Sequence, residues 1–367
     1  MRFPGKALDR GVGRRLGKLV IGPLILVLLA GCSLWPGADA FPRAPLDLPK
    51  LTWAPPRCGD AKHSCVTLYL QNTGSHQIPI LNSNTDYRIY LPTNGPLAGG
   101  ITIAGGRRVE IIGGQIDLTY PCSSDASRCI GIYIAKNSPG EVFVEGVWIH
   151  NAHRIGPACP GGASRRLQTC STGDGIDVNT ANEGVVNVNT ITLEDIRVDG
   201  ISGCSGYADH ADVFQPYQAP GDTIRIDGMT GVTNCQGFTL DPDLAYSKWR
   251  MLPSSITVKN TNVDVTSNPY SSTGAGAAWW LTYGLSCVSG PISLSDDYSS
   301  QPRTDSDPPP IYPNLGGHRC GVRYSDGAVS WASARINGSI RIGAPARGDF
   351  VPVGVAGLGY LSPGYQY

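Results

Sequence analysis

Five segments of similar sequence recur along the chain, and this repeat limits the possible folds more than any other feature. Each segment has two apolar residues two positions apart, then a Gly, Asp or Asn, then a second short apolar run. The segments are residues 109–118, 142–151, 191–200, 224–233 and 256–265. Their first residues are 33, 49, 33 and 32 positions apart, and the long interval contains the stretch from Cys159 to Cys170. One such unit cannot bury its own apolar residues, so we expect the units to stack on one another.

The composition agrees with a body made of strands. The chain has 47 Gly and 29 Pro among 367 residues, and only 16 % of its residues are charged. Gly and Pro disfavour helix interiors, and short alternating runs separated by Gly, Asn, Asp and Ser replace any sustained helical period. We therefore expect an all-β fold, and the composition argues against a coiled coil or a disordered chain.

A second set of short runs lies between the repeated segments. These runs are residues 131–134, 175–178, 213–216, 237–240 and 279–282. Because strand side chains alternate between two faces, one residue of each of the first four runs is predicted to join an inward apolar ladder of Ile132, Ile176, Phe214 and Phe238. The following residues then form an outward column of Tyr133, Asp177, Gln215 and Thr239, about 4.8 Å apart, which matches the pitch of a sugar chain.

Over about residues 75–345, this pattern resembles the single-stranded right-handed parallel β-helix of the pectate lyase (pectin lyase-like) superfamily. The resemblance implies a solenoid in which each repeat is one turn. A β-sandwich is the alternative, and it would require hairpin signals and irregular spacing. We expect the β-helix domain at residues 57–345 and a C-terminal tail at residues 346–367.

The first 31 residues have the pattern of an export signal. A basic stretch ends at Lys18, and the apolar run that follows is too short to span a bilayer as a stable helix. Residues 29–32, Leu-Ala-Gly-Cys, resemble a bacterial lipobox, which implies cleavage before Cys32 and a lipid on its thiol. The alternative is an ordinary cleaved signal peptide. The Pro-rich residues 32–56 would be a tether, and we expect a monomer anchored by lipid to the bacterial cell envelope, facing the periplasm or the exterior.

Ten cysteines remain after Cys32, an even number that suits an oxidising compartment. Pairing of sequence neighbours predicts five disulfides: Cys58–Cys65, Cys122–Cys129, Cys159–Cys170, Cys204–Cys235 and Cys287–Cys320. A metal site is the alternative, but the chain has no Cys-x-x-Cys pair, which argues against zinc.

Beyond the leader, the chain has 23 basic and 28 acidic residues. There is no run of basic residues, and phosphate neutralisation needs clustered Lys and Arg, so we expect no nucleic-acid partner.

Two neighbouring turns carry the residues with the greatest potential for chemistry. One contains Asp174 and Asp177, and the next contains Asp209-His210-Ala211-Asp212. The alignment of the runs places Asp174 beside Asp212, so three carboxylates and an imidazole come close together. Close carboxylates raise one another's pKa, which gives a general acid beside a general base. The predicted catalytic residues are therefore His210, Asp212, Asp177 and Asp174. The structural alternative is that the aspartates cap strand corners, because Asp-Gly is common in turns.

The same face is predicted to bind the substrate. Side chains from four turns contribute to it: Gln215, Asp241, Lys248, Arg250, Trp280 and Tyr133. One indole of the pair Trp279-Trp280 should enter the core and the other should face outward, where it would stack on a sugar or pack under a loop. A Ca²⁺ ion held by Asp174, Asp177 and Asp212 is a further hypothesis, because calcium takes several oxygen ligands.

The reaction class stays open at this point. Polygalacturonase-like hydrolases of the superfamily carry an Asn-Thr-Asp-Gly run, to which only residues 173–175 are similar, and Asp296-Asp297 is expected in a Pro-rich loop. Residues 209–212 look more like the acid–histidine–acid motif of alginate epimerases and some lyases, which implies that His210 exchanges a proton at a uronic acid. We expect a carbohydrate-active protein that cleaves or modifies a polysaccharide as a hydrolase, lyase or epimerase. The alternative is a non-catalytic adhesin or glycan-binding scaffold, whose aspartates would be used in corner hydrogen bonds.

Overall fold

The computed structural model describes residues 50–118, 130–135, 140–151, 174–181, 189–201, 211–233, 236–240, 251–266, 277–281, 291–300, 311–312, 320–332 and 335–365. All of them belong to one compact unit, Leu46–Tyr367. These ranges contain strands β1 to β22 and no α-helix, so the described chain is all-β, as predicted. No helix in these ranges has the length and hydrophobicity needed to cross a membrane.

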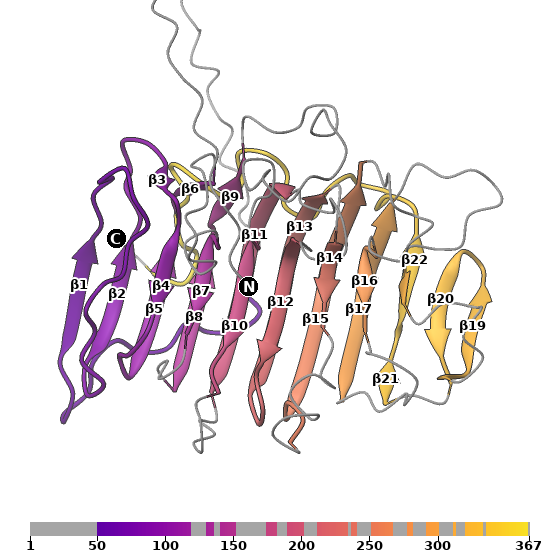
Figure 1. Ribbon diagram of the computed structural model, residues 1–367, viewed down its shortest axis with the longest axis horizontal. Coiled ribbons are helices and arrows are strands. Elements are labelled where there is room, and N and C mark those ends of the chain that lie inside the picture. The colour runs from indigo at the N-terminus through magenta and orange to yellow at the C-terminus, as the bar shows by residue number, and fades with distance from the viewer. Residues whose placement is uncertain are drawn as a thin grey trace, which may run out of the picture. The chain divides into compact units, whose positions relative to one another are not determined.

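Most strands form a 15-stranded sheet, called the large sheet, whose neighbours run parallel except at its C-terminal end (Figure 1). Its main path is β1 (Cys65–Tyr69), β2 (Asp86–Tyr90), β5 (Arg108–Ile112), β8 (Glu141–Glu145), β11 (Thr190–Ile201), β13 (Thr223–Thr233), β15 (Ser255–Val265), β17 (Ile292–Ser300), β22 (Ser339–Ile342), β20 (Ala328–Trp331) and β19 (Val322–Ser325). Off this path lie β3 (Leu97–Ala98), β6 (Gln115–Asp117), β9 (Trp148–His150) and β21 (Ile336–Asn337). The register pairs Val109, Val142, Ile191, Ile224 and Ile256 in succession, which confirms the predicted alignment of the repeats.

A second, seven-stranded sheet, called the small sheet, is parallel throughout. It contains β4 (Ile101–Ile103), β7 (Ile132–Ile134), β10 (Ile176–Asn179), β12 (Asp212–Gln218), β14 (Gln236–Thr239), β16 (Trp279–Trp280) and β18 (Ile311–Tyr312). From β4 to β18 the chain alternates between the two sheets. The register pairs Ile132, Ile176, Phe214 and Phe238 in this order, and all four are fully buried, which confirms the predicted apolar ladder.

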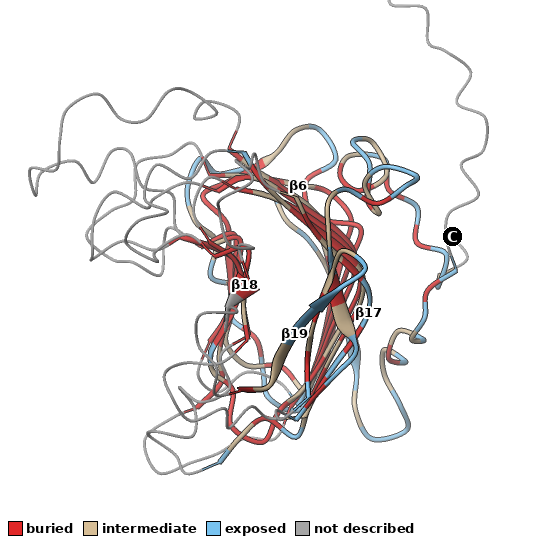
Figure 2. Ribbon diagram, turned by 90° about the vertical axis from the view of Figure 1, so that its right-hand side faces the viewer, coloured by how far each residue is buried: buried red, intermediate tan, exposed pale blue. Residues whose placement is uncertain are grey.

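The two sheets face each other across one apolar core (Figure 2). On the small-sheet side, the ring of Phe238 lies between Phe214 and Trp279, with centroid distances of 5.9 and 4.7 Å. Trp279 is fully buried, and its Nε1 donates a hydrogen bond to the Tyr298 carbonyl at 3.2 Å. Trp280 is half-buried on the other face of the sheet, so the two indoles divide as predicted.

A column of residues in the left-handed backbone conformation bends the strands of the large sheet. It consists of Gly113, Gly146, Asp195, Gly228, Asn260 and Asp296, whose φ angles lie between 48° and 68°. Pairing continues on both sides of the column, as in Glu194 with Asp227 and Ile196 with Met229. Gly, Asn and Asp adopt this conformation at the lowest cost, which explains the Gly, Asp or Asn in every repeat.

The pair Asp296-Asp297 corrects one expectation. Both residues lie within β17 and not in a Pro-rich loop. Asp296 occupies the corner position, and Asp297 is buried and accepts hydrogen bonds from the N–H groups of Ser295 and Thr261, at 2.9 and 3.2 Å. The Pro-rich sequence begins only after this strand, and Asp296 makes the bend that other repeats make with Gly, Asp or Asn.

The C-terminal end of the large sheet departs from the parallel pattern. Strands β19 and β20 form an antiparallel hairpin, and β20 also runs antiparallel to β22. The hairpin turn is Asp326-Gly327, with φ angles of 52° and 71°. These positive values are those that a two-residue hairpin turn requires.

The structure contains the predicted Cys58–Cys65 disulfide. Cys320 is also disulfide-bonded. The other predicted partners lie outside the described residues, so the remaining pairings stay predictions; these partners are Cys122, Cys129, Cys159, Cys170, Cys204, Cys235 and Cys287.

Two segments at the ends of the described chain contact the outer face of the large sheet. The N-terminal strap, residues 50–57, includes Thr52 and Trp53, whose backbone N–H groups each donate to a Glu194 oxygen at 2.8 Å. The C-terminal belt, residues 349–365, is fixed where the Val351 N–H donates to Thr230 Oγ1 at 3.0 Å and the Gly357 N–H donates to the Gly146 carbonyl at 2.8 Å. Residues assigned from the sequence to a tether and a tail thus contact the sheet directly.

Candidate functional site

The candidate site lies on the outer face of the small sheet. The register places Asp177 between Tyr133 and Gln215, and Thr239 beside Trp280. Each of these residues neighbours a buried core residue along its strand, so its side chain points away from the core. The outward column predicted from the sequence is therefore confirmed.

Asp174 and Asp212 come together at the edge where β10 and β12 begin. The Asp212 N–H donates to Asp174 Oδ1 at 2.9 Å, and the Gly175 N–H donates to the Asp212 carbonyl at 2.8 Å. Ile176 pairs with Phe214, and residues at equal distances from such a pair lie side by side on parallel strands. Asp174 and Asp212 each lie two positions before this pair, so they are brought to the same place. The predicted neighbourhood of Asp174 and Asp212 is correct.

The electrostatic environment of Asp177 is strongly perturbed. Burial raises the pKa of Asp177 well above its usual range, and the negative charges of Asp174 and Asp212 raise it further, against hydrogen bonds from the N–H groups of Tyr217 and Val178. Its Oδ1 has no hydrogen-bond partner among the described residues. A carboxylic acid in this environment keeps its proton at a pH where ordinary carboxyl groups have lost theirs.

The other two carboxyl groups make contacts typical of a structural role. Asp212 is fully buried and accepts a hydrogen bond from the Thr239 hydroxyl on the next strand. Asp174 accepts the Asp212 N–H, as a corner-capping residue would. The geometry therefore gives Asp177 the properties of a proton donor, with Asp174 and Asp212 as its charged neighbours.

Four predicted site residues lie outside the described part of the chain: His210, Asp241, Lys248 and Arg250. Their roles stay predictions. Gln215 is buried beside Asp177, and Tyr133 and Trp280 are half-buried on the same face.

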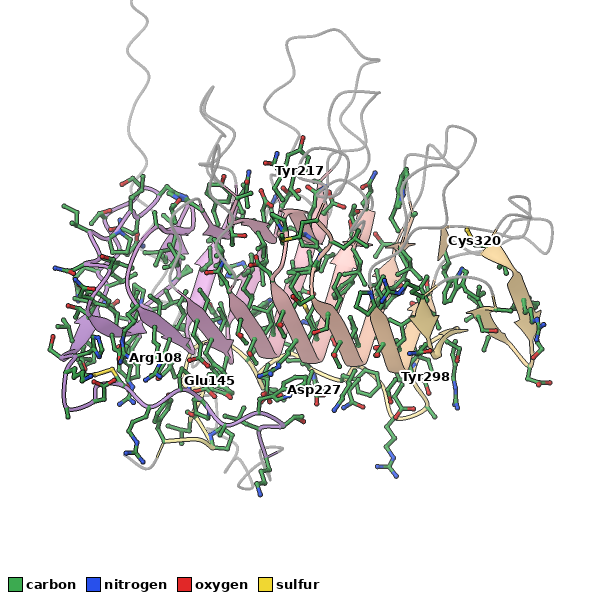
Figure 3. All side chains as sticks on the ribbon, turned by 90° about the horizontal axis from the view of Figure 1, so that it is seen from below. Arg108, Glu145, Tyr217, Asp227, Tyr298 and Cys320 are labelled. Carbon is green, nitrogen blue, oxygen red and sulfur yellow. A yellow bond between two sulfur atoms is a disulfide. The ribbon has the colours of Figure 1, made fainter. Side chains whose placement is uncertain are left out.

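Tyr217 is a member of this face that the sequence analysis missed. Its side chain is 40 % exposed and lies on the side of the molecule opposite to Glu145 and Asp227 (Figure 3). The register slips here, because Asp177 pairs with Gln215 but Asn179 pairs with Gln218, which is a bulge with one extra residue in β12. Pro216 within the strand was the available signal, since proline in a parallel strand marks an edge or a bulge.

Within the described ranges, no group of three or more His, Cys, Asp or Glu side chains is arranged to hold a metal ion. The calcium ion suggested from the sequence at Asp174, Asp177 and Asp212 stays a hypothesis.

Comparisons with known proteins give no match: no family model fits the sequence, and no curated protein or solved structure is significantly similar to it.

Proposed function

We propose that the protein is an exported, lipid-anchored enzyme that cleaves a polysaccharide by general acid–base catalysis on the outer face of the small sheet. The observation that carries this proposal is the group of three aspartates, in which one buried carboxyl group has a strongly raised pKa beside two others. Hydrolysis of a glycosidic bond needs one protonated and one ionised carboxyl group on the same site.

In this mechanism Asp177 is the general acid. It donates its proton to the glycosidic oxygen as the bond to the anomeric carbon breaks. The ionised carboxylate of Asp174 or Asp212 stabilises the positive charge that develops on the sugar and accepts a proton from the water that adds to the anomeric carbon. In a lyase or an epimerase, His210, which lies in the same sequence motif as Asp212, would be the group that exchanges the proton.

The face around Asp177 suits a sugar chain that crosses the strands. Tyr133 and Trp280 lie on either side of the aspartates in the order of the strands, and strand neighbours are about 4.8 Å apart. Aromatic rings stack on sugar faces, and Gln215 beside Asp177 supplies an amide for hydroxyl groups. Asp241, Lys248 and Arg250 would extend this surface.

We further propose that the two sheets belong to one right-handed parallel β-helix related to the pectate lyase superfamily. The alternation of the chain between two parallel sheets and the in-register repeats of 32 or 33 residues support it. Crossovers between parallel strands are right-handed in nearly all proteins, which supports the handedness. A lipid on Cys32 would attach this domain to the membrane through residues 33–49.

A non-catalytic glycan-binding scaffold is the second candidate. It is favoured by the contacts of Asp174 and Asp212, which are used in hydrogen bonds at the strand corners. The enzyme and the scaffold differ in one property, because only the enzyme needs the proton on Asp177.

The test uses residues 46–367, incubated with a panel of neutral and uronic polysaccharides. Reducing ends and the absorbance of unsaturated uronates are followed together for the wild type, for Asp177→Asn, and for Asp326→Asn in the exposed hairpin turn as a control. A hydrolase releases reducing ends alone, and Asp177→Asn lowers the rate by about 10²- to 10⁴-fold while the control does not. Both signals together would indicate a lyase. Binding without either signal, or equal rates in both variants, would remove Asp177 as the acid.

A further inference from the structure

The outer face of the large sheet carries a column of buried carboxyl groups that the proposed reaction does not use. Glu145, Glu194 and Asp227 pair in succession on β8, β11 and β13, and Asp195 lies at the adjacent corner. Each of the four is less than a tenth exposed. In the described part of the chain, Glu145, Glu194 and Asp195 take part in no ion pair, so no cation compensates their burial.

Tyr360 of the C-terminal belt lies over two of these groups. Its hydroxyl oxygen is 3.3 Å from Glu145 Oε2 and 3.3 Å from Asp195 Oδ2. The Ser362 side chain also hydrogen-bonds to Glu145, while Glu145 Oε1 has no partner among the described residues. At Tyr360 and Ser362, the belt is thus attached to the buried carboxyl groups by hydroxyl groups alone.

Counting protons shows what this geometry requires. A phenol hydroxyl has one proton and donates it to one carboxylate. The second carboxyl group can hydrogen-bond to the same phenol oxygen only if it carries a proton itself. Two ionised carboxylates around one buried oxygen would leave a repelling pair with no cation.

The electrostatics of the two groups agree with one retained proton. Burial raises the pKa of Glu145 to about 7 and that of Asp195 to about 6, although hydrogen bonds from Tyr360 act in the opposite direction. The negative charge of Asp195 raises the pKa of Glu145 further, and that of Asp227 does the same for Asp195. Like charges on neighbouring strands therefore favour the neutral form.

The other charged groups near this point have partners of their own. Glu194 accepts two N–H groups of the strap, and Asp227 accepts Asn260 Nδ2 at 2.6 Å and the Thr52 hydroxyl. Glu110, whose charge also acts on Glu145, is bonded to Arg88 at 3.0 Å and to Tyr365 of the belt. Arg225 and Lys259 lie over the ring of Trp53, at 5.9 and 5.1 Å from its centroid.

We propose that Glu145, Tyr360 and Asp195 form a proton-dependent clasp, and that loss of its proton above neutral pH releases residues 357–365 of the belt from the large sheet. The sign follows from the direction of the shifts: a carboxyl group that binds its proton more tightly in the closed form stabilises that form at low pH. This stabilisation is complete below the ordinary carboxyl range and is lost as the pH rises through about 7. The other end of the belt stays attached, because Arg197 Nη1 donates to Asp349 Oδ2 and to the Val351 carbonyl, at 2.9 and 2.7 Å.

Hydrogen–deuterium exchange on the full chain tests the clasp, with protection factors corrected for the intrinsic pH dependence of exchange. The Gly357 N–H donates to the sheet, and the Tyr360 N–H donates within the belt. If the proton of the clasp is held by Glu145, the protection factors of both amides should fall about tenfold between about pH 6 and pH 8.5. The amides of Val351 and of the sheet residue Val144 should stay protected. Loss of protection at all of these sites together would mean global unfolding and would overturn the proposal.

Variants with neutral side chains of the same size separate the clasp from other causes of pH-dependent opening of the belt. Glu145→Gln and Asp195→Asn together should keep residues 357–365 closed at both pH values. Glu141→Gln, a change of the same kind at the half-buried start of the same strand, should behave as the wild type. Equal pH dependence in the double variant, or no pH dependence in the wild type, would refute a proton held between Glu145 and Asp195.

Discussion

The contact between Gly146 and Tyr360 gives a sharp test of how the belt stabilises the fold. Gly146 lies in the left-handed column with a φ of 65°, and a Cβ atom at this position would overlap the ring of Tyr360. In Gly146→Ala, the backbone alone costs about 1–2 kcal/mol because an L-residue is strained in this conformation. The ring must also move, which exposes a side chain that is 8 % exposed in the wild type.

The displacement of Tyr360 adds to the backbone strain. Exposing a large aromatic side chain costs about 1.5–3 kcal/mol, and weakening its hydrogen bonds costs about 1 kcal/mol. We therefore expect Gly146→Ala to lower the free energy of unfolding by about 3.5–6 kcal/mol. Gly140→Ala is the matched control, because its Cβ would meet only the Arg107 carbonyl, at an ordinary 3.8 Å. Its effect should stay within about 1 kcal/mol of zero.

Urea denaturation followed by tryptophan fluorescence measures both variants. The decisive comparison repeats Gly146→Ala in a Tyr360→Ala background, where only the backbone strain of about 1–2 kcal/mol should remain. An undiminished cost in that background would mean that the ring and the glycine do not interact. A cost below about 1 kcal/mol in the wild-type background would refute the left-handed conformation as well.

Three further predictions concern the core, the belt and the pH dependence of stability. Phe238→Ala should lower the free energy of unfolding by about 3–5 kcal/mol because it removes the middle ring of a buried aromatic stack, whereas the exposed Tyr217→Ala should change it by less than about 0.5 kcal/mol. Arg197→Ala should cost about 2–4 kcal/mol by urea denaturation and should expose the belt to limited proteolysis, since it removes the donor to Asp349 Oδ2 and to the Val351 carbonyl. Burial raises the pKa of Glu194 to about 7 and that of Asp222 to about 6, so the melting temperature should be highest near pH 5 and fall toward pH 8. Glu194→Gln should flatten that profile, and a melting temperature that rises over this range would contradict the buried carboxyl groups.

The parts of the fold that depend on local chemistry could be predicted from the sequence. Gly, Asp and Asn at the corner, together with alternating apolar residues, were enough to fix the register of the repeats, as the pairing of Val142 with Ile191 and of Ile176 with Phe214 shows. The same alignment brought Asp174 and Asp212 together. Such patterns are readable because each repeat meets the same steric and burial demands.

Other features depend on contacts between distant residues, and the sequence carries no pattern for them. The importance of Asp177 over Asp212 arises from the Asp177 Oδ1 atom, which has no partner among the described residues, and from the Thr239 hydroxyl, which donates to Asp212 from the next strand. The belt lacks a period, so its contacts with Glu145 and Thr230 were not foreseen. Two local signals were overlooked: Asp326-Gly327, which makes the antiparallel hairpin, and Pro216, which accompanies the bulge beside the site.

The belt also determines when the molecule can finish folding. In an array of repeats each unit contacts only its neighbours, so structure can grow along the chain as it is made. Tyr360, however, contacts Glu145 across 215 positions, and Thr52 contacts Glu194 across 142. A chain that emerges with its N-terminus first can pair its strands early, but Glu145 and Asp195 on the outer face stay hydrated until Tyr360 of the belt arrives. The slowest step of folding should then be the docking of the C-terminal belt, because contacts at such long separations form late.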